Sequence, residues 1–153
     1  MNYTITQIED AIIDKLSGLK ASLGVKTIKS YQGELDNEEE IARTARLFPA
    51  IIVMYVGSDY DEHGGRKNEK PTITLFVCDK NLRAEEEARR GGSGNPGTYA
   101  MLNGIRDLLY GSRLTLDIFP LSLLRERPIW FSKGVSIYSA EYETAQALLY
   151  PGD

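Results

Sequence analysis

The chain has few of the residues on which catalytic and metal sites are usually built. Its 153 residues include one cysteine, Cys78, and one histidine, His63. A single cysteine cannot form a disulfide within the chain, and this one lies inside an apolar run, as a small buried residue does. No cysteine or glycine-framed serine is positioned to use the lone imidazole as a base. We therefore expect no catalytic residue, no cofactor and no metal, and a protein that is not an enzyme.

Long hydrophobic runs and an excess of basic charge are also missing. No stretch approaches the roughly 18 apolar residues of a membrane helix, and we expect neither a membrane span nor a secretory signal. The net charge is −4 and the isoelectric point about 5.1. This balance argues against direct nucleic-acid readout, because phosphate binding needs a basic face. With 42% hydrophobic and 26% charged residues, the composition predicts a single domain over residues 1–153.

The longest apolar run, residues 48–57, predicts a central strand. Its apolar residues are consecutive from 51 to 56, so both faces carry apolar side chains, as in a strand that is covered on both sides. Pro49 and Gly57 mark its ends. A second apolar run, residues 72–78, follows a polar turn and is expected to pair with the first in antiparallel fashion.

Apolar residues at three- and four-residue spacing predict an amphipathic helix from residue 5 to 23, with Thr4 as its N-cap and Gln7 completing a capping box. Further elements are expected as follows: a strand over 25–34, helices over 36–45 and 98–110, a connection over 114–124 and a hairpin over 128–142. The order predicts an α/β fold of the α+β type. Its sheet is mixed and mainly antiparallel, with four to five strands, helices packed on it and a long polar loop.

The polar loop, residues 79–97, is the candidate interaction site. It exceeds the roughly 12–15 residues that loops in compact domains rarely pass, and its glycines raise the entropic cost of fixing it. We expect a flexible arm, poorly ordered in an isolated protomer. Opposite charges make the arm complementary to a copy of itself, which suits a head-to-tail ring contact, although a solvated loop explains them equally well. The candidate contact residues are Arg83, Glu85, Glu86, Glu87, Arg89 and Arg90.

Two segments imitate ligand-binding motifs. Asp59, Asp61 and Gly64 match the start of a calcium loop, but Lys70 stands where the bidentate acid belongs. We therefore expect a polar hairpin loop over residues 58–65, whose role stays open.

The second segment, residues 92–97, reads G-x-G-x-x-G and precedes a helix. A dinucleotide fingerprint needs a buried strand leading directly into its first glycine, and the last apolar strand ends at Cys78. A P-loop fails as well, because Thr98 and Tyr99 occupy the lysine and hydroxyl positions.

Several segments carry a resemblance to a known family: residues 8–13, residues 48–53, Thr98 and Tyr99 with Leu102, Leu108 and Leu109, and residues 120–124. In their order over nearly the whole chain, the sequence resembles the Mu-like phage tail proteins, a family of unknown function similar in pattern to the tail terminators of long-tailed phages. The resemblance implies a homo-oligomer, a hexameric ring that caps the tail tube and offers a surface to head-connector proteins. It implies a virion tail protein assembled in the bacterial cytoplasm.

Two other functions remain open. A monomeric adaptor could dock a partner through an exposed sheet edge, since the main-chain groups of an edge strand can accept another strand. A small metal- or nucleotide-dependent enzyme would use the acidic loop, residues 58–65, or the glycine loop, residues 92–97. A melting temperature raised by calcium, magnesium, zinc or ATP would favour the enzyme.

Overall fold

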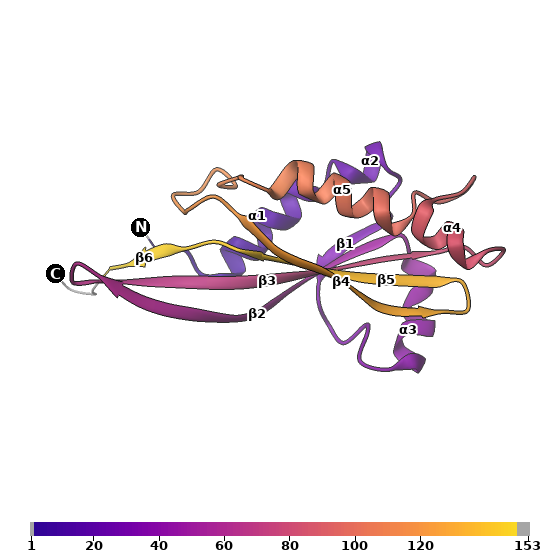
Figure 1. Cartoon of the computed structure of the whole chain (residues 1–153), viewed down its shortest axis with the longest axis horizontal. Coiled ribbons are helices and arrows are strands. Elements are labelled where there is room, and N and C mark those ends of the chain that lie inside the picture. Colours follow the sequence, from indigo (N-terminus) through magenta and orange to yellow (C-terminus); the bar gives the residue numbers. More distant parts are fainter. Residues whose placement is uncertain (1, 150–153) are drawn as a thin grey trace.

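The computed structural model describes residues 2–149 and shows a six-stranded sheet with helices on both faces (Figure 1). The elements are α1 Ile5–Leu16, α2 Leu19–Ser22, β1 Thr27–Ser30, α3 Glu38–Thr44, the 3₁₀ turn η1 Ala45–Leu47, β2 Ala50–His63, β3 Arg66–Lys80, α4 Glu85–Arg90, α5 Thr98–Leu109, β4 Ser122–Ser132, β5 Val135–Glu143 and β6 Gln146–Leu148. The strand order is β1-β2-β3-β5-β4, with β6 beside β3. β1 pairs with β2 in parallel and the other pairs are antiparallel. The predicted α+β class is confirmed. The predicted sheet had four to five strands, and the structure adds β6 as a sixth.

The first helix begins at the predicted cap. The hydroxyl of Thr4 accepts a hydrogen bond from the Gln7 amide at 3.1 Å, and the Gln7 side chain accepts one from the Thr4 amide at 2.8 Å. The predicted helix over 5–23 is divided at Ser17 into α1 and α2. Gly24, with φ 74°, lies just beyond α2 and turns the chain toward β1.

The core consists of two apolar clusters, one on each face of the sheet. The larger lies under α1, α2 and α5 and includes Ile8, Ile12, Leu16, Ile51, Val53, Leu75, Val77, Ile105, Leu109 and Tyr142. The smaller lies under α3 and consists of Ile41, Phe48, Ala50, Ile52, Cys78, Val135 and Ile137. β2 therefore contributes to both clusters, as its uninterrupted apolar run predicted. Cys78 is fully buried, and burial raises the pKa of its thiol.

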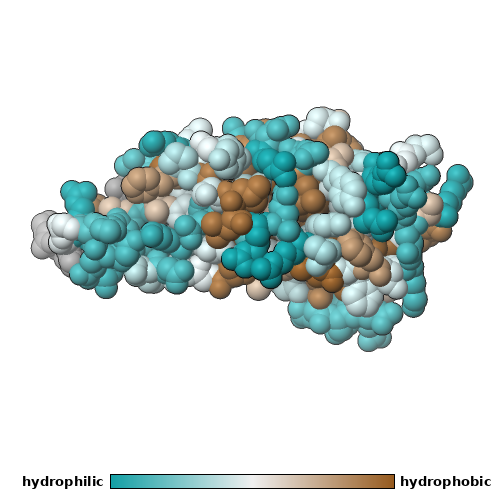
Figure 2. Space-filling view, viewed as in Figure 1, coloured by the Kyte–Doolittle hydropathy of each residue, from teal (hydrophilic) through white to brown (hydrophobic). Residues whose placement is uncertain are grey.

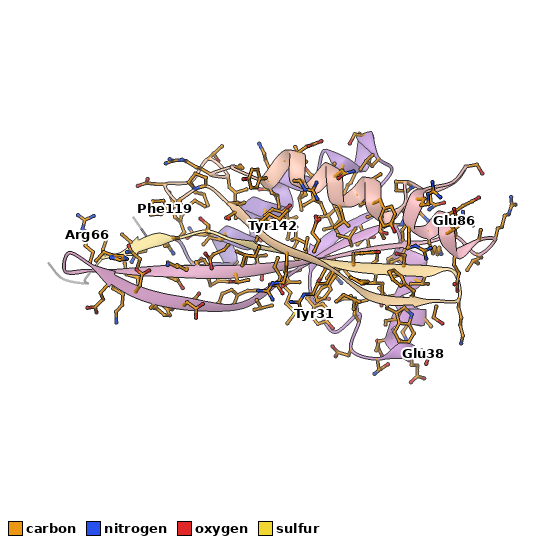
Figure 3. The ribbon with its side chains drawn as sticks, in the orientation of Figure 1. Tyr31, Glu38, Arg66, Glu86, Phe119 and Tyr142 are labelled. Carbon is orange, nitrogen blue, oxygen red and sulfur yellow. The ribbon has the colours of Figure 1, made fainter. Side chains whose placement is uncertain are left out.

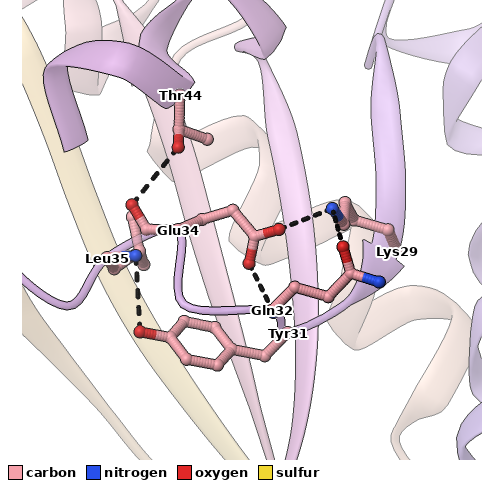
Figure 4. A network of polar contacts seen from close by, with 6 residues as sticks. All are labelled: Lys29, Tyr31, Gln32, Glu34, Leu35 and Thr44. Atoms are coloured by element: carbon pink, nitrogen blue, oxygen red, sulfur yellow. Dashed lines mark hydrogen bonds and ion pairs between the residues drawn. The ribbon is translucent and has the colours of Figure 1, made fainter. Parts of the chain in front are cut away.

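The segment leading into α3 is held by the buried carboxylate of Glu34 (Figure 4). Glu34 forms an ion pair with Lys29 and accepts a hydrogen bond from the Gln32 amide, and its main-chain carbonyl accepts one from Thr44 at 3.3 Å. Burial alone would raise the pKa of Glu34, but the bonds to Lys29 and to backbone amides outweigh burial and lower it. The network holds α3 against the smaller cluster.

β2 and β3 continue past the end of the helix layer as a long hairpin (Figure 1). The predicted loop over residues 58–65 is wrong in extent, because β2 runs to His63 and the turn consists of Gly64 and Gly65, with φ 60° and 81°. Asp61 contacts Lys70 across the hairpin at 2.7 Å. The polar residues that suggested a loop are thus cross-strand pairs.

The β4–β5 hairpin forms where it was predicted, with Lys133 and Gly134 in its turn. β4 begins earlier than expected, at Ser122, so the end of the predicted connection over 114–124 is strand. Its pairing with β5 shifts register between Leu123 and Arg125, and again further along the strand. These bulges interrupt the alternation of side chains that a sequence pattern needs to reveal a strand.

Candidate functional site

The arm, residues 79–97, is anchored by a buried carboxylate at its start. Asp79 is 0% exposed. It accepts hydrogen bonds from the Lys80 amide at 2.7 Å, from the Asn95 side chain at 2.9 Å and from the Gly97 amide at 2.7 Å. Burial raises the pKa of Asp79, although the three donors act in the opposite direction. One side chain therefore joins both ends of the arm.

A second set of hydrogen bonds, donated by side-chain amide groups, fixes α4 inside the arm. The Asn81 side chain donates to the Glu87 carboxylate and to the Asn95 carbonyl oxygen, each at 2.9 Å. The Asn95 side chain also donates to the main-chain carbonyl of Glu87 at 2.9 Å. The arm thus has more regular structure than the sequence predicted, because polar contacts take the place of the apolar ones it lacks. Ala88 is its only fully buried apolar side chain among the described residues.

The glycines of the arm serve close backbone packing. Gly97 has φ 86°, and a Cβ on it would lie 2.3 Å from the main-chain nitrogen of Gly91. Gly92 forms a bridge with Asn95. The chain enters this loop from α4 and not from a strand, so the run over residues 92–97 lacks the context of a dinucleotide fingerprint.

Three of the six candidate contact residues are engaged within the protomer. Glu85 accepts a hydrogen bond from the Gly134 amide at 3.3 Å, and Glu87 belongs to the amide network described above. The Arg89 guanidinium lies 5.4 Å from the centre of the Phe131 ring, a cation–π contact. Glu85 and Arg89 thus attach the arm to the β4–β5 hairpin.

The other three, Arg83, Glu86 and Arg90, are exposed. Glu86 and Arg90 form an ion pair at 2.7 Å, with side chains 63% and 68% exposed. Figure 3 shows Glu86 at the opposite end of the molecule from Arg66, which lies beside the β2–β3 turn. Exposed pairs of this kind contribute only about 0–1 kcal/mol to stability, so Glu86 and Arg90 can exchange this contact for one with a partner at little cost.

Aromatic side chains continue this surface beside the arm. Phe131 and Tyr99, each 42% exposed, contact Tyr138 with ring centroids 5.3 and 5.9 Å apart. Leu124 and Ile129, also exposed, lie on the same strand as Phe131. Figure 2 looks onto this side of the molecule, and hydrophobic residues gather along β4 between hydrophilic ones. A mixed apolar and charged surface is typical of protein contacts.

The described sheet is open on both sides, at β4 on one side and at β1 and the uncovered part of β2 on the other. β5 pairs with one side of β4, and within residues 2–149 no strand pairs with the other. β1 covers β2 only from Ala50 to Val53, so the same side of β2 is open over residues 54–63. The Tyr55 amide, which donates to Glu9 at 3.3 Å, is the exception on this stretch. Open main-chain groups can accept another strand.

The acidic stretch of β2 shows no arrangement for a cation. Asp61 is held by Lys70 and Asn68, and these bonds lower the pKa of Asp61. His63 lies 3.8 Å from Asp61 and is largely exposed. Across residues 2–149, no group of three or more His, Cys, Asp or Glu side chains is placed to hold a metal ion. None of the described helices combines the length and apolar character needed to cross a membrane.

Comparisons with known proteins match nearly the whole chain. The family model described as "Bacteriophage Mu, Gp37" matches residues 4–147. A solved chain of the "Virion of native gene transfer agent (GTA) particle" is similar in fold, with a TM-score of 0.50 and 16% sequence identity over 96% of this chain and 100% of that one. At this identity the likeness shows the fold alone. No curated protein matches the chain.

Proposed function

The chain belongs to the bacteriophage Mu, Gp37 family, and from this premise we propose that it is a structural protein of a phage or prophage tail. The family match carries the proposal, because it extends from residue 4 to 147 and so includes both the helix layer and the sheet. The likeness in fold to a chain of a virion particle supports a place in the virion.

Within the tail, the role we propose is that of a terminator. A hexameric ring of this protein would cap the tail tube and join it to head-connector proteins. A ring of identical subunits needs two different, mutually complementary surfaces on each protomer. The chain offers unlike surfaces of this kind in its charged arm and its two open sheet edges, which supports assembly from one repeated contact.

An adaptor is the alternative function. The open edge of β4, with its exposed apolar residues, favours this reading, since an extended segment of a partner can add to such an edge. In that case the protein stays monomeric and binds the partner with one edge.

Electron microscopy of the purified protein tests these two functions. We expect negatively stained particles with a central hole, and the same particles at one end of the tubes when tail tubes are added. Mass by light scattering checks that the particle is a hexamer. A monomer at every concentration that neither forms rings nor binds tube ends would overturn the terminator role and leave the adaptor.

Deletion in the phage tests the function in its own setting. Because a cap stops the polymerisation of the tube, we expect lysates without the protein to contain tubes longer than wild-type tails and heads without tails. The wild-type chain supplied from a plasmid is the control and should restore joined particles. Normal tails in its absence would contradict the proposal.

A further inference from the structure

We propose that the open edge of β4 in one copy of the chain pairs with the open edge of β2, residues 54–63, in a second copy. The two sheets then join in antiparallel register, with Arg127 opposite Asp59 and Arg125 opposite Asp61. This inference rests on the proposed assembly and deepens it, because it names the surfaces that meet.

The lengths of the two edges match. β4 spans Ser122–Ser132, 11 residues, and the stretch that β1 leaves open on β2, residues 54–63, is nearly as long. The proposed register places the end of β4 opposite Met54, just beyond the last residue that β1 covers. Its start lies at the Gly64 turn. A neighbouring β4 therefore fills the gap between β1 and the turn without displacing either.

The strand directions are also compatible. β2 is antiparallel to β3, β3 to β5, and β5 to β4, so β4 runs opposite to β2 within one protomer. A second copy placed beside the first in the same orientation thus presents its β2 antiparallel to β4. The contact joins two different surfaces, and repeating it closes a ring when the rotation between copies allows. In the proposed register each copy is shifted along the strand direction relative to its neighbour. Tilting the strands accommodates this shift, as in closed barrels.

The basic residues of β4 point away from the helix layer. Glu126 forms an ion pair with Arg106 of α5 at 2.7 Å, so it faces the helices. Successive side chains of a strand point to opposite faces. Its neighbours, Arg125 and Arg127, therefore face the other side of the sheet.

The acidic residues of β2 point to that same side. Tyr60 donates a hydrogen bond to Glu69 at 3.2 Å. Glu69 shares a face of β3 with Ile73, which belongs to the cluster under the helices. By alternation, Asp59 and Asp61 face away from the helices. Opposite residues in an antiparallel pair share a face, so the register brings acids and bases together.

The charges left unused in the protomer are complementary. Asp59 and Arg127 are both exposed, and neither forms an ion pair with another residue of the described chain. Pairing across the joint provides each with a partner. Such contacts fix register and partner choice more than affinity.

The second pair extends a row of alternating charge. Arg125 contacts Glu141 of β5 at 3.1 Å, and Asp61 contacts Lys70 of β3 at 2.7 Å. The proposed register sets Arg125 beside the Asp61 of the next copy. The row Glu141, Arg125, Asp61, Lys70 then crosses four strands with opposite charges as neighbours throughout, an arrangement that stabilises cross-strand pairing.

Apolar side chains lie along both edges as well. Leu124 and Ile129 of β4 are 42% and 48% exposed, and Val56 and Tyr60 of β2 are 50% and 54% exposed. Bulges occur at each edge, and Pro128 interrupts the donors of β4. Bulges and proline on an edge discourage pairing with arbitrary strands. The joint is thus open to a matching edge and poorly suited to general aggregation.

A charge exchange tests the register. We expect Arg127→Asp and Asp59→Arg each to raise the dissociation constant of the oligomer at least tenfold at low salt, and the chain carrying both changes to recover most of the loss. Sedimentation velocity at several protein concentrations measures this. Lys20→Asp and Asp10→Arg make the same charge changes on α2 and α1 and serve as controls that should leave assembly unchanged.

A disulfide trap locates the contact directly. Opposite residues of an antiparallel pair have Cα atoms about 4.5–5.5 Å apart, within reach of a disulfide. Asp59→Cys with Arg127→Cys in one chain should give a covalent ladder of oligomers on oxidation, while Asp59→Cys with Arg113→Cys should not. Cys78 is fully buried and does not compete.

The outcomes separate this inference from the proposed function. A ladder, together with recovery in the exchanged chain, supports the edge contact. Rings without a ladder, unaffected by the single substitutions, overturn the edge contact and leave the ring intact. A chain that forms no oligomer, alone or on tail tubes, and no ladder at any concentration overturns both.

Discussion

The two ends of the β2–β3 ribbon are held by different forces. At the core end both faces are covered, and Ile51, Ile52 and Leu75 are at most 1% exposed. At the hairpin end, beyond Gly57, the faces are polar and the strands are joined by contacts such as Asp61 with Lys70. The same strands can therefore anchor the fold at one end and offer a free edge at the other, because apolar burial is concentrated at the core end.

One side-chain clasp connects the hairpin to the rest of the chain. The Glu69 carboxylate, on a residue 8% exposed, accepts hydrogen bonds from Gln146 at 2.9 Å, Ser58 at 3.0 Å and Tyr60 at 3.2 Å. Gln146 also bonds the main chain of Tyr3 through both its amide atoms, at 2.8 and 2.9 Å. The hairpin, β6 and the start of the chain are thus joined through polar groups.

Truncations at two positions of β3 should differ most strongly. Leu75→Ala removes a fully buried side chain from the larger cluster, and we expect it to lower the free energy of unfolding by about 2–5 kcal/mol. Lys67→Ala, on the hairpin part of the same strand, removes an exposed side chain and should change it by about 0.5 kcal/mol or less. Urea denaturation measures both. Equal losses would show that the hairpin is as closely packed as the core.

The clasp should give an intermediate effect with a local signature. Gln146→Ala leaves buried partners without their hydrogen bonds, and we expect a loss of about 1–3 kcal/mol in unfolding free energy. Amide exchange should accelerate in β6 and near Tyr3 while the core end of β2 stays protected. Gln32→Ala, which truncates an exposed glutamine and removes only the exposed hydrogen bond that it accepts from Lys29 at 3.2 Å, is the matched control. Uniform acceleration over the whole sheet would show that the two ends unfold as one unit.

The parts of the fold that the sequence predicted depend on neighbouring residues. Thr4 and Gln7 form the predicted cap because they lie within one turn, and the part of the apolar run from Ala50 to Val53 is buried on both faces because its own composition requires it. The contacts that join the ends of the arm and the presence of β6 depend on remote partners. Asp79 bonds a residue 18 positions away, and Gln146 bonds Tyr3 across 143 positions. No local pattern records such contacts.

The same reasoning applies to the candidate site. The charge pattern made the arm residues candidates for a contact, but it could not show that Glu85 and Glu87 are used inside the protomer. An exposed sheet edge was expected as a docking surface, but the sequence could not say which strands form it, because an edge is defined by which strands lie beside one another. β1 is shorter than the predicted strand over 25–34, and this shortness leaves residues 54–57 of β2 uncovered. Residues 58–63 lie beyond the reach of even the predicted strand in this register.

The arm provides a small expected change in stability and a direct test of which surface makes the contact. Arg89→Glu with Arg90→Glu removes one cation–π contact and one exposed ion pair, so the free energy of unfolding should fall by about 1 kcal/mol or less. If the arm contributes to the contact between subunits, ring formation should be slowed or abolished at low salt, where exposed charges are least screened. Light scattering at low and high salt measures this.

Lys15→Glu with Lys20→Glu gives the same change of net charge on α1 and α2 as a control. Assembly that proceeds unchanged in the arm variant would remove the arm from the contact and leave the β4 and β2 edges as the joining surface.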